Sequence, residues 1–326
     1  MSALEIMGRG MWQADPRLRR AETHVSPNVL VLLVAATVLY GLRGATALGG
    51  LLGRRVRPAL DRATLLGAVG CHAAFLVVRA IEGGGIQAGS RLDSVAFFLW
   101  LTAVVFLLAA RPYRIQAIAP VFWPCLAAGM VAMWALAGRE AAEPASFGKL
   151  WLTLHLVPVY LGYAGFAIAA GAGGAYLVQE RLLRRKGAGA PWRLLPSLET
   201  LQRVEWAALS LGYPVFTVGL VAGILWAYQT RSPLGGAWYA DPKVLGGLVV
   251  WLFYTAALHL RLFLRLRGRR AALLTVVGFL FTLLSFGTAH LYGDGGRGEG
   301  TGASRGSTSS PRPEPVEGRA RPEAGP

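Results

Sequence analysis

Four histidines lie inside long apolar runs of the chain, where a polar ring is unusual. They are His72, His155, His259 and His290. Placing an imidazole in hydrocarbon costs free energy, so a histidine inside a membrane-spanning segment usually serves a function. A neutral imidazole binds iron, copper or zinc through one of its ring nitrogens. For any one of these residues, the alternative role is a hydrogen bond between helices.

The apolar runs around these histidines predict an all-α, polytopic membrane protein. The chain has 326 residues, of which 54% are hydrophobic and 15% are charged, and its mean hydropathy is +0.45. A membrane-spanning helix needs about 20 mostly apolar residues. We therefore expect about eight transmembrane helices, over residues 28–49, 63–82, 94–110, 115–137, 151–179, 205–229, 244–264 and 271–292.

Basic residues alternate between the loops that join these runs. The loop regions after the first, third, fifth and seventh runs hold 17 arginines and lysines, whereas the other three hold 5. By the positive-inside rule, the first set faces the cytoplasm. Both termini, and the loop that contains Trp238 and Asp241, then lie on the outer side. The net charge of +16 thus reflects topology rather than nucleic-acid binding. We expect a multi-pass protein of the cell (plasma) membrane with its active loop on the extracytoplasmic side.

The composition divides the chain into three parts. Residues 1–27 form an outer N-terminal tail, residues 28–292 the eight-helix membrane domain, and residues 293–326 an outer C-terminal tail. The C-terminal tail is rich in Gly, Pro, Ser, Arg and Glu and contains no aromatic residue, so we predict that it is disordered. Ser197 and the spaced leucines after it predict an interfacial helix that runs into the sixth span.

The four histidines fall at two depths. His155 and His290 lie near the outer ends of their runs, at the level of the Trp238–Asp241 loop. His72 and His259 lie about nine and five residues from the cytoplasmic ends of theirs, or about 13 and 8 Å at 1.5 Å per residue. Two histidines on opposite sides of a flat macrocycle supply both axial ligands of a haem. The pairs therefore predict two positions for haem b, as cargo or substrate, with all four histidines as ligands of the iron.

Two further features suggest side chains that support such a site. Trp251, Thr255 and His259 share one helix face, because they are spaced four residues apart. Arg79 lies in the second run, where it meets an anionic group such as a haem propionate, or extends its side chain to the outer interface, or pairs with Glu82.

Several blocks in the second half of the chain form a distinctive pattern. They are Leu195-Pro196-Ser197-Leu198-Glu199-Thr200-Leu201, Gly212-Tyr213-Pro214, Trp226-Ala227, Trp238-Tyr239-Ala240-Asp241-Pro242-Lys243, Trp251 and Leu258-His259-Leu260-Arg261. These blocks resemble the cytochrome c assembly family, which includes the CcsA/ResC proteins of system II cytochrome c biogenesis and the HemX-like proteins. Weaker similarity covers Leu154-His155 and the segment from Gly89 to Ser94.

The resemblance implies a membrane subunit of cytochrome c maturation, which carries haem across the membrane and presents it at an outer Trp/Asp loop for covalent attachment to apocytochrome c. It implies that Trp238 and Asp241 belong to that loop, flanked by His155 and His290. By the same resemblance, His259 and His72 are ligands inside the membrane. The implied partners are apocytochrome c, a second membrane subunit of the system II synthase and a thioredoxin-like thiol reductant, besides the lipid bilayer. Whether the chain is part of a holocytochrome c synthase (haem lyase) complex stays open.

Two alternatives of other classes remain. One is a HemX-like membrane regulator or scaffold that is linked to haem biosynthesis and has no haem-transfer activity. The other is a proton or solute transporter with relay histidines. We rank the transporter last, because proton relays usually include intramembrane carboxylates and these are almost absent from the runs.

Overall fold

The structure, a computed structural model, describes residues 27–51, 53, 57–82, 91–110, 115–136, 149–184, 196–231 and 238–295. Over these ranges the chain forms eight α-helices and two short 3-10 helices. This confirms the prediction of an all-α protein with about eight helices. The predicted tails, residues 1–27 and 293–326, lie outside the described residues except for Pro27 and for residues 293–295, which extend the last helix.

The observed helices follow the predicted spans closely, with differences of a few residues at their ends. Their bounds are α3 Pro27–Leu51, α4 Pro58–Glu82, α5 Arg91–Ala110, η1 Ile115–Ile118, α6 Ala119–Leu136, α7 Lys149–Arg184, α8 Leu198–Arg231, η4 Trp238–Ala240, α9 Pro242–Phe263 and α10 Arg269–Gly295.

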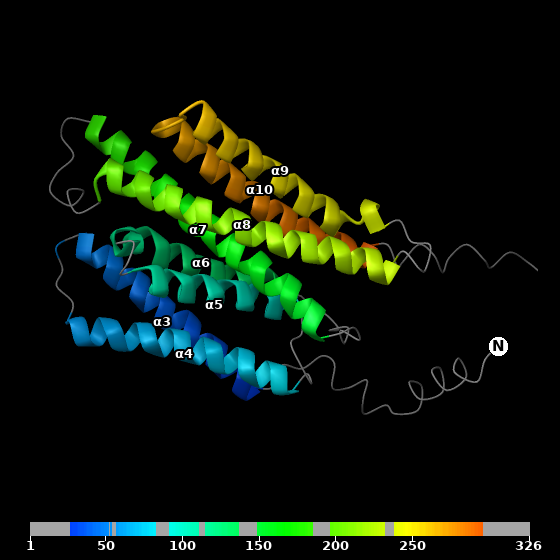
Figure 1. Cartoon of the computed structure of the whole chain (residues 1–326). Coiled ribbons are helices and arrows are strands. Elements are labelled where there is room, and N and C mark those ends of the chain that lie inside the picture. The colour runs from blue at the N-terminus through cyan, green and yellow to red at the C-terminus, as the bar shows by residue number, and fades with distance from the viewer. Residues whose placement is uncertain are drawn as a thin grey trace, which may run out of the picture.

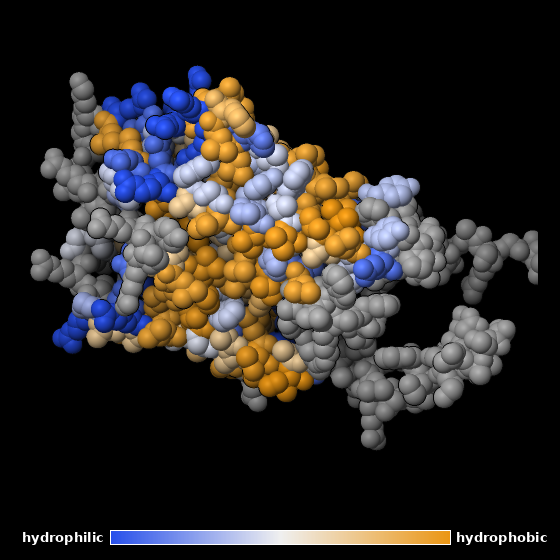
Figure 2. Space-filling model, viewed as in Figure 1, coloured by the Kyte–Doolittle hydropathy of each residue, from blue (hydrophilic) through white to orange (hydrophobic). Residues whose placement is uncertain are grey.

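Length and composition make these helices suitable for a membrane. Within the described residues, six helices are long and apolar enough to cross a bilayer, namely α3, α4, α5, α7, α8 and α9. The apolar part of α6, Ala119–Trp134, is shorter. In Figure 2 an apolar belt covers the middle of the molecule, and hydrophilic residues gather at the end where α4 begins and α9 ends. The chain is therefore a multi-pass membrane protein.

The helices form a bundle in which α3 and α4 lie on one side and α9 and α10 on the opposite side, with α5 to α8 between them (Figure 1). Helix α3 packs against α4 and α6, and α7 packs against α8 and α10. Helix α5 joins the two halves, because it contacts α6 as well as α7. The start of α7, the end of α8, η4, the start of α9 and the end of α10 meet at one end of the bundle (Figure 1).

Glycines bring the backbones of α7 and α8 into direct contact. A Cβ atom added at Gly165 would lie 2.9 Å from Cα of Gly212, and one added at Gly219 would lie 2.6 Å from the backbone nitrogen of Val159. Both distances are under 3.0 Å, so a side chain at either glycine would force the neighbouring helix to shift. Small residues allow this close approach in membrane helices. The paired positions run in opposite directions, so the two helices are antiparallel and their register is set by the glycines.

Helix α8 begins where the sequence predicts. The Ser197 side chain accepts a hydrogen bond from the backbone N–H of Thr200 at 3.2 Å, which satisfies one of the free N–H groups of the first turn. From Leu198 the helix continues without interruption to Arg231, a length of 34 residues. The predicted interfacial helix and the sixth span are therefore a single helix.

Candidate functional site

His155 occupies a slot on α8 that glycine makes possible. Its Nδ1 atom lies 2.8 Å from the backbone oxygen of Gly219. A Cβ atom at Gly223 would overlap the imidazole ring, so no larger residue fits at that position without moving the ring. Because a carbonyl oxygen only accepts hydrogen bonds, Nδ1 carries the hydrogen, and in the neutral ring Nε2 keeps its lone pair. Histidines that bind metals are oriented in this way by a second hydrogen bond.

Position 290 lies at the same height in the bundle as His155. Helices α7 and α10 pack against each other in opposite directions, and a Cβ at Gly173 would lie 3.1 Å from the carbonyl oxygen of Ala272. His155 precedes Gly173 by 18 residues, and His290 follows Ala272 by the same number. Eighteen residues correspond to about 27 Å and about five full turns. Both positions therefore lie towards the end of the bundle where η4 also lies. The side chain of His290 is outside the described part.

Asp241 stabilises the start of α9. Its carboxylate accepts a hydrogen bond from the backbone N–H of Lys243 at 2.7 Å, and Pro242 occupies the first helical position. This is an N-cap, which typically stabilises a helix by about 1 kcal/mol. The preceding residues form η4, which packs against both α8 and α9. The sequence interpretation missed this capping role. The side chain of Trp238 lies outside the described part.

His259 stands at the end of a row of polar side chains that joins α9 to α8. The Trp251 indole N–H donates to the Thr217 hydroxyl at 3.1 Å, and the hydroxyls of Tyr213 and Thr255 lie 2.6 Å apart. One turn further along α9, Nδ1 of His259 lies 2.7 Å from the carbonyl oxygen of Thr255. This bond again leaves Nε2 as the free ring nitrogen. The His259 ring is exposed on the surface of the bundle and stacks on Phe263.

The structure does not bring His72 and His259 together. His72 is fully buried in α4, which packs against α3 and α5, whereas α9 packs against α8 and α10 on the other side of the bundle (Figure 1). The depths also differ, because α4 begins at Pro58, five residues before the predicted start. His72 lies 14 residues from that start and His259 four from the end of α9, or about 21 and 6 Å. The expectation that these two rings meet across one plane was therefore wrong.

A buried ion pair that the sequence interpretation missed joins three helices. Glu205 on α8 is fully buried, and Arg261 on α9 lies 3.1 Å from its carboxylate. The Thr275 hydroxyl on α10 donates to the same carboxylate, and the Arg261 guanidinium lies 5.2 Å from the centre of the Trp206 ring. Arg261 is thus part of the helix packing, although its charge was assigned to a cytoplasmic loop. A carboxylate at the start of an apolar run was the signal that could have revealed this pair.

Arg79 interacts electrostatically with Glu82, one of its predicted partners, but its hydrogen bonds go to a residue that was not predicted. Its guanidinium donates two hydrogen bonds to the Asp93 carboxylate, at 2.9 and 2.6 Å. Such a two-point pair fixes the orientation of both groups. Arg79 therefore ties α4 to α5, and this arrangement does not favour a haem propionate as its partner.

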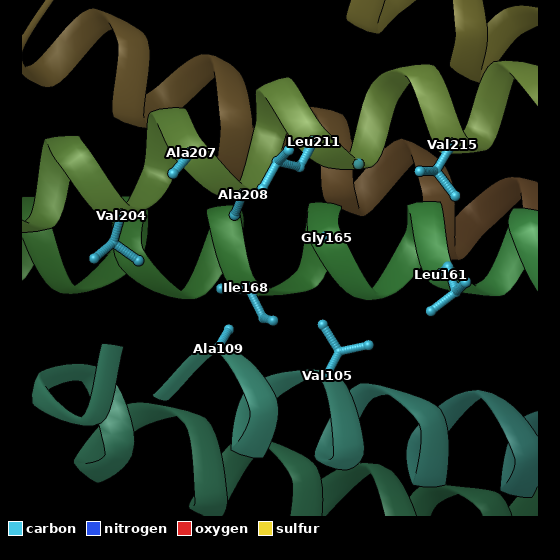
Figure 3. Close-up of a pocket in the computed structure, with 11 residues that line it drawn as sticks. Val105, Ala109, Leu161, Gly165, Ile168, Val204, Ala207, Ala208, Leu211 and Val215 are labelled. Atoms are coloured by element: carbon cyan, nitrogen blue, oxygen red, sulfur yellow. The ribbon is translucent and has the colours of Figure 1, made fainter. Parts of the chain in front are cut away.

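An apolar pocket of about 190 Å³ lies between α5 and the α7–α8 pair (Figure 3). Val105 and Ala109 face Leu161 and Ile168 across it. Its lining residues are aliphatic or glycine, so this pocket offers no ligand to a metal.

Comparison with known proteins agrees with the resemblance. The sequence profile described as "Cytochrome C assembly protein" matches residues 88–294, which include α5 to α9 and all but the last residue of α10. The cytochrome c biogenesis protein CcsA of Microcystis aeruginosa is 26% identical over 274 residues, covering 69% of this chain and 82% of that protein. CcsA of Synechococcus elongatus is 27% identical over 284 residues, covering 73% and 86%. Protein HemX of Bacillus subtilis is 28% identical over 200 residues, covering 60% and 70%. Because the profile spans more than half of its length, this chain belongs to the cytochrome c assembly protein family.

Proposed function

We propose that this protein handles haem during cytochrome c biogenesis, with His155 and His290 as the two ligands of the iron at one end of the bundle. One observation carries the proposal. The hydrogen bond from Nδ1 of His155 to the backbone oxygen of Gly219 fixes the ring and leaves Nε2 available to bind iron. The ring makes an interhelical hydrogen bond to α8 through Nδ1, and because that bond uses only one ring nitrogen, Nε2 is left for an iron ligand bond.

The register of α7 and α10 supports His290 as the opposite ligand. Both positions lie about 27 Å from the point where Gly173 meets Ala272. The η4 helix, which begins at Trp238, lies at the same end and is followed by Asp241, the N-cap of α9 (Figure 1). An indole offers a flat apolar surface on which a macrocycle can stack.

The charge distribution supports the outer side of the membrane for this end. The arginine-rich segments follow α3, α5, α7 and α9, and each of these helices ends at the end of the bundle away from η4 (Figure 1). By the positive-inside rule those segments face the cytoplasm. Haem is then carried across the membrane and presented at η4, where the thiols of apocytochrome c add across its vinyl groups to form thioether bonds. A second membrane subunit of the system II synthase and a thiol reductant are the further partners that we propose.

His259 is the second candidate ligand. Its Nδ1 atom is bonded to a backbone oxygen, as in His155, and its ring is exposed on α9. We propose that His259 binds haem inside the membrane without His72, because the two rings lie on different sides of the bundle.

An absorption spectrum of the purified protein tests the proposal. Expressed in haem-replete cells, the protein is expected to show the Soret and low-spin bands of a haem bound by two histidines. His155→Gly should lose most of this absorbance, and added imidazole should restore it. His24→Ala, a histidine outside the apolar runs, is the matched control. A colourless wild-type protein refutes haem binding and favours a HemX-like scaffold, for which the similarity to Protein HemX is the supporting observation.

A further inference from the structure

Four polar side chains from three helices gather in the half of the bundle that the proposed function does not use. They are Tyr40 and Arg43 on α3, His72 on α4 and Trp123 on α6. The Tyr40 ring meets the His72 ring edge-on at 5.9 Å and stacks on Trp123 at 6.0 Å. The Arg43 guanidinium lies 5.7 Å from the centre of the Trp123 ring. The four side chains therefore form one cluster.

This cluster contains most of the buried polar atoms that have no hydrogen-bond partner. Within the described residues, eight side-chain atoms are buried without a partner, and five of them belong to these four residues. The five are the Tyr40 hydroxyl, Nε of Arg43, both ring nitrogens of His72 and Nε1 of Trp123. The backbone of Ala96 approaches the His72 ring, but not in hydrogen-bonding geometry.

Buried polar groups in folded proteins almost always have a partner, which is protein, water or a ligand. Five unpartnered atoms in one place therefore indicate a partner that is not a protein side chain. Membrane interiors make the requirement stricter, because no bulk water reaches an unsatisfied group there.

The charges and the burial of the side chains decide which partner is compatible with the cluster. Arg43 already lies 3.1 Å from the Asp61 carboxylate, so the cluster has no uncompensated positive charge for an anion. Among the described residues no three His, Cys, Asp or Glu side chains group together as they would around a metal ion. The His72 ring is sealed between Tyr40 and Phe75, whose ring centre lies 6.4 Å away, which leaves no face for a macrocycle. A small molecule that both donates and accepts hydrogen bonds matches the hydrogen-bonding chemistry of all four groups.

We propose that Tyr40, Arg43, His72 and Trp123 enclose bound water deep in the membrane domain. A buried water makes about three hydrogen bonds to groups that would otherwise be unsatisfied. The indole and the guanidinium donate to the water, while the hydroxyl and the imidazole both donate and accept. This role for His72 differs from iron binding and does not depend on the proposed function.

The burial of the side chains indicates where the water enters. Asp61 is 32% exposed near the start of α4, Arg43 is 14% exposed, Trp123 1%, and Tyr40 and His72 are fully buried. Along α4, His72 lies 11 residues beyond Asp61, or about 16 Å. The cluster therefore connects the arginine-rich end of the bundle to a point well inside the bilayer.

Radiolytic hydroxyl labelling of the full chain in lipid nanodiscs, read by mass spectrometry, tests the proposal, because ordered water next to a side chain is a local source of hydroxyl radicals. Tyr163 is the matched control, since it is 8% exposed and lies among aromatic rings on α7. Bound water predicts that Tyr40 is labelled several-fold faster than Tyr163, although Tyr40 is the less exposed of the two. Equal or slower labelling of Tyr40 overturns the proposal.

His72→Phe provides the second measurement, because it keeps an aromatic ring and removes both nitrogens. Labelling of Tyr40 and Trp123 is expected to fall several-fold, and the absorbance of bound haem is expected to stay unchanged. A loss of haem absorbance with unchanged labelling of Tyr40 would assign His72 to iron and refute the water site. Where this variant fails to fold, the comparison of Tyr40 with Tyr163 in the wild-type protein still decides.

Discussion

The slot at Gly223 offers a test of the His155 site that leaves the histidine itself in place. In Gly223→Ala the new methyl group would overlap the imidazole, so the ring must turn away from α8. The ring would lose its hydrogen bond to Gly219, which contributes about 1 kcal/mol. It would also leave its preferred rotamer, at a cost of about 1 kcal/mol for a turn of about 30°. Together these terms predict a loss of about 2 kcal/mol in haem binding.

At 1.4 kcal/mol per factor of ten, a loss of about 2 kcal/mol weakens haem binding by about 30-fold. The measurement is a haem titration of the protein in nanodiscs, followed at the Soret band. Gly174→Ala is the matched control, because a Cβ at that helical position meets nothing within 4 Å. If Gly223→Ala binds haem as tightly as Gly174→Ala while His155→Ala binds none, the slot does not orient the ligand and the reasoning about its tautomer is wrong.

Three further changes test the packing around the site. Glu205→Ala leaves Arg261 buried without its partner, so we expect a loss of about 3–5 kcal/mol in the free energy of unfolding. Denaturation in mild detergent measures this loss, and Glu199→Ala, which removes an exposed carboxylate, is the control. Asp241→Ala removes the N-cap of α9 and should lower the stability by about 1 kcal/mol, whereas Asp241→Asn should retain most of it; equal losses would contradict the capping role. Gly165→Val forces α7 away from Gly212 and should lower the melting temperature far more than Gly171→Ala, which meets open space.

The positions of the helices were predictable because each signal is local. An apolar run of about 20 residues indicates a span whatever its neighbours are. The start of α4 was missed by five residues because Asp61 and Arg62 interrupt the apolar run, although Pro58 is a common first residue of a helix. Ser197 showed where α8 begins, because its hydroxyl caps the helix within three residues.

The neighbours of each side chain were much less predictable. Hydropathy gives the depth of a residue but not the side of the bundle on which its helix lies, so His72 and His259 were paired although α4 and α9 are far apart. The same limit explains why Asp93 on α5, the hydrogen-bonded partner of Arg79, was not predicted, whereas Glu82, its near neighbour in sequence, was. The capping role of Asp241 was visible in the sequence, since it precedes Pro242, but the residue was interpreted only as part of the functional loop.

The glycine contacts between α7 and α8 make the position of His155 independent of the loop that contains Trp238 and Asp241. His155 is held by α8 through Gly219 and Gly223, within the same row of contacts that joins the two helices, and no residue of η4 takes part in that hydrogen bond. Substitutions in the loop before α9 can therefore accumulate without moving this histidine. The position of the His155 ring and the sequence of the loop before α9 are thus independent of each other in this fold.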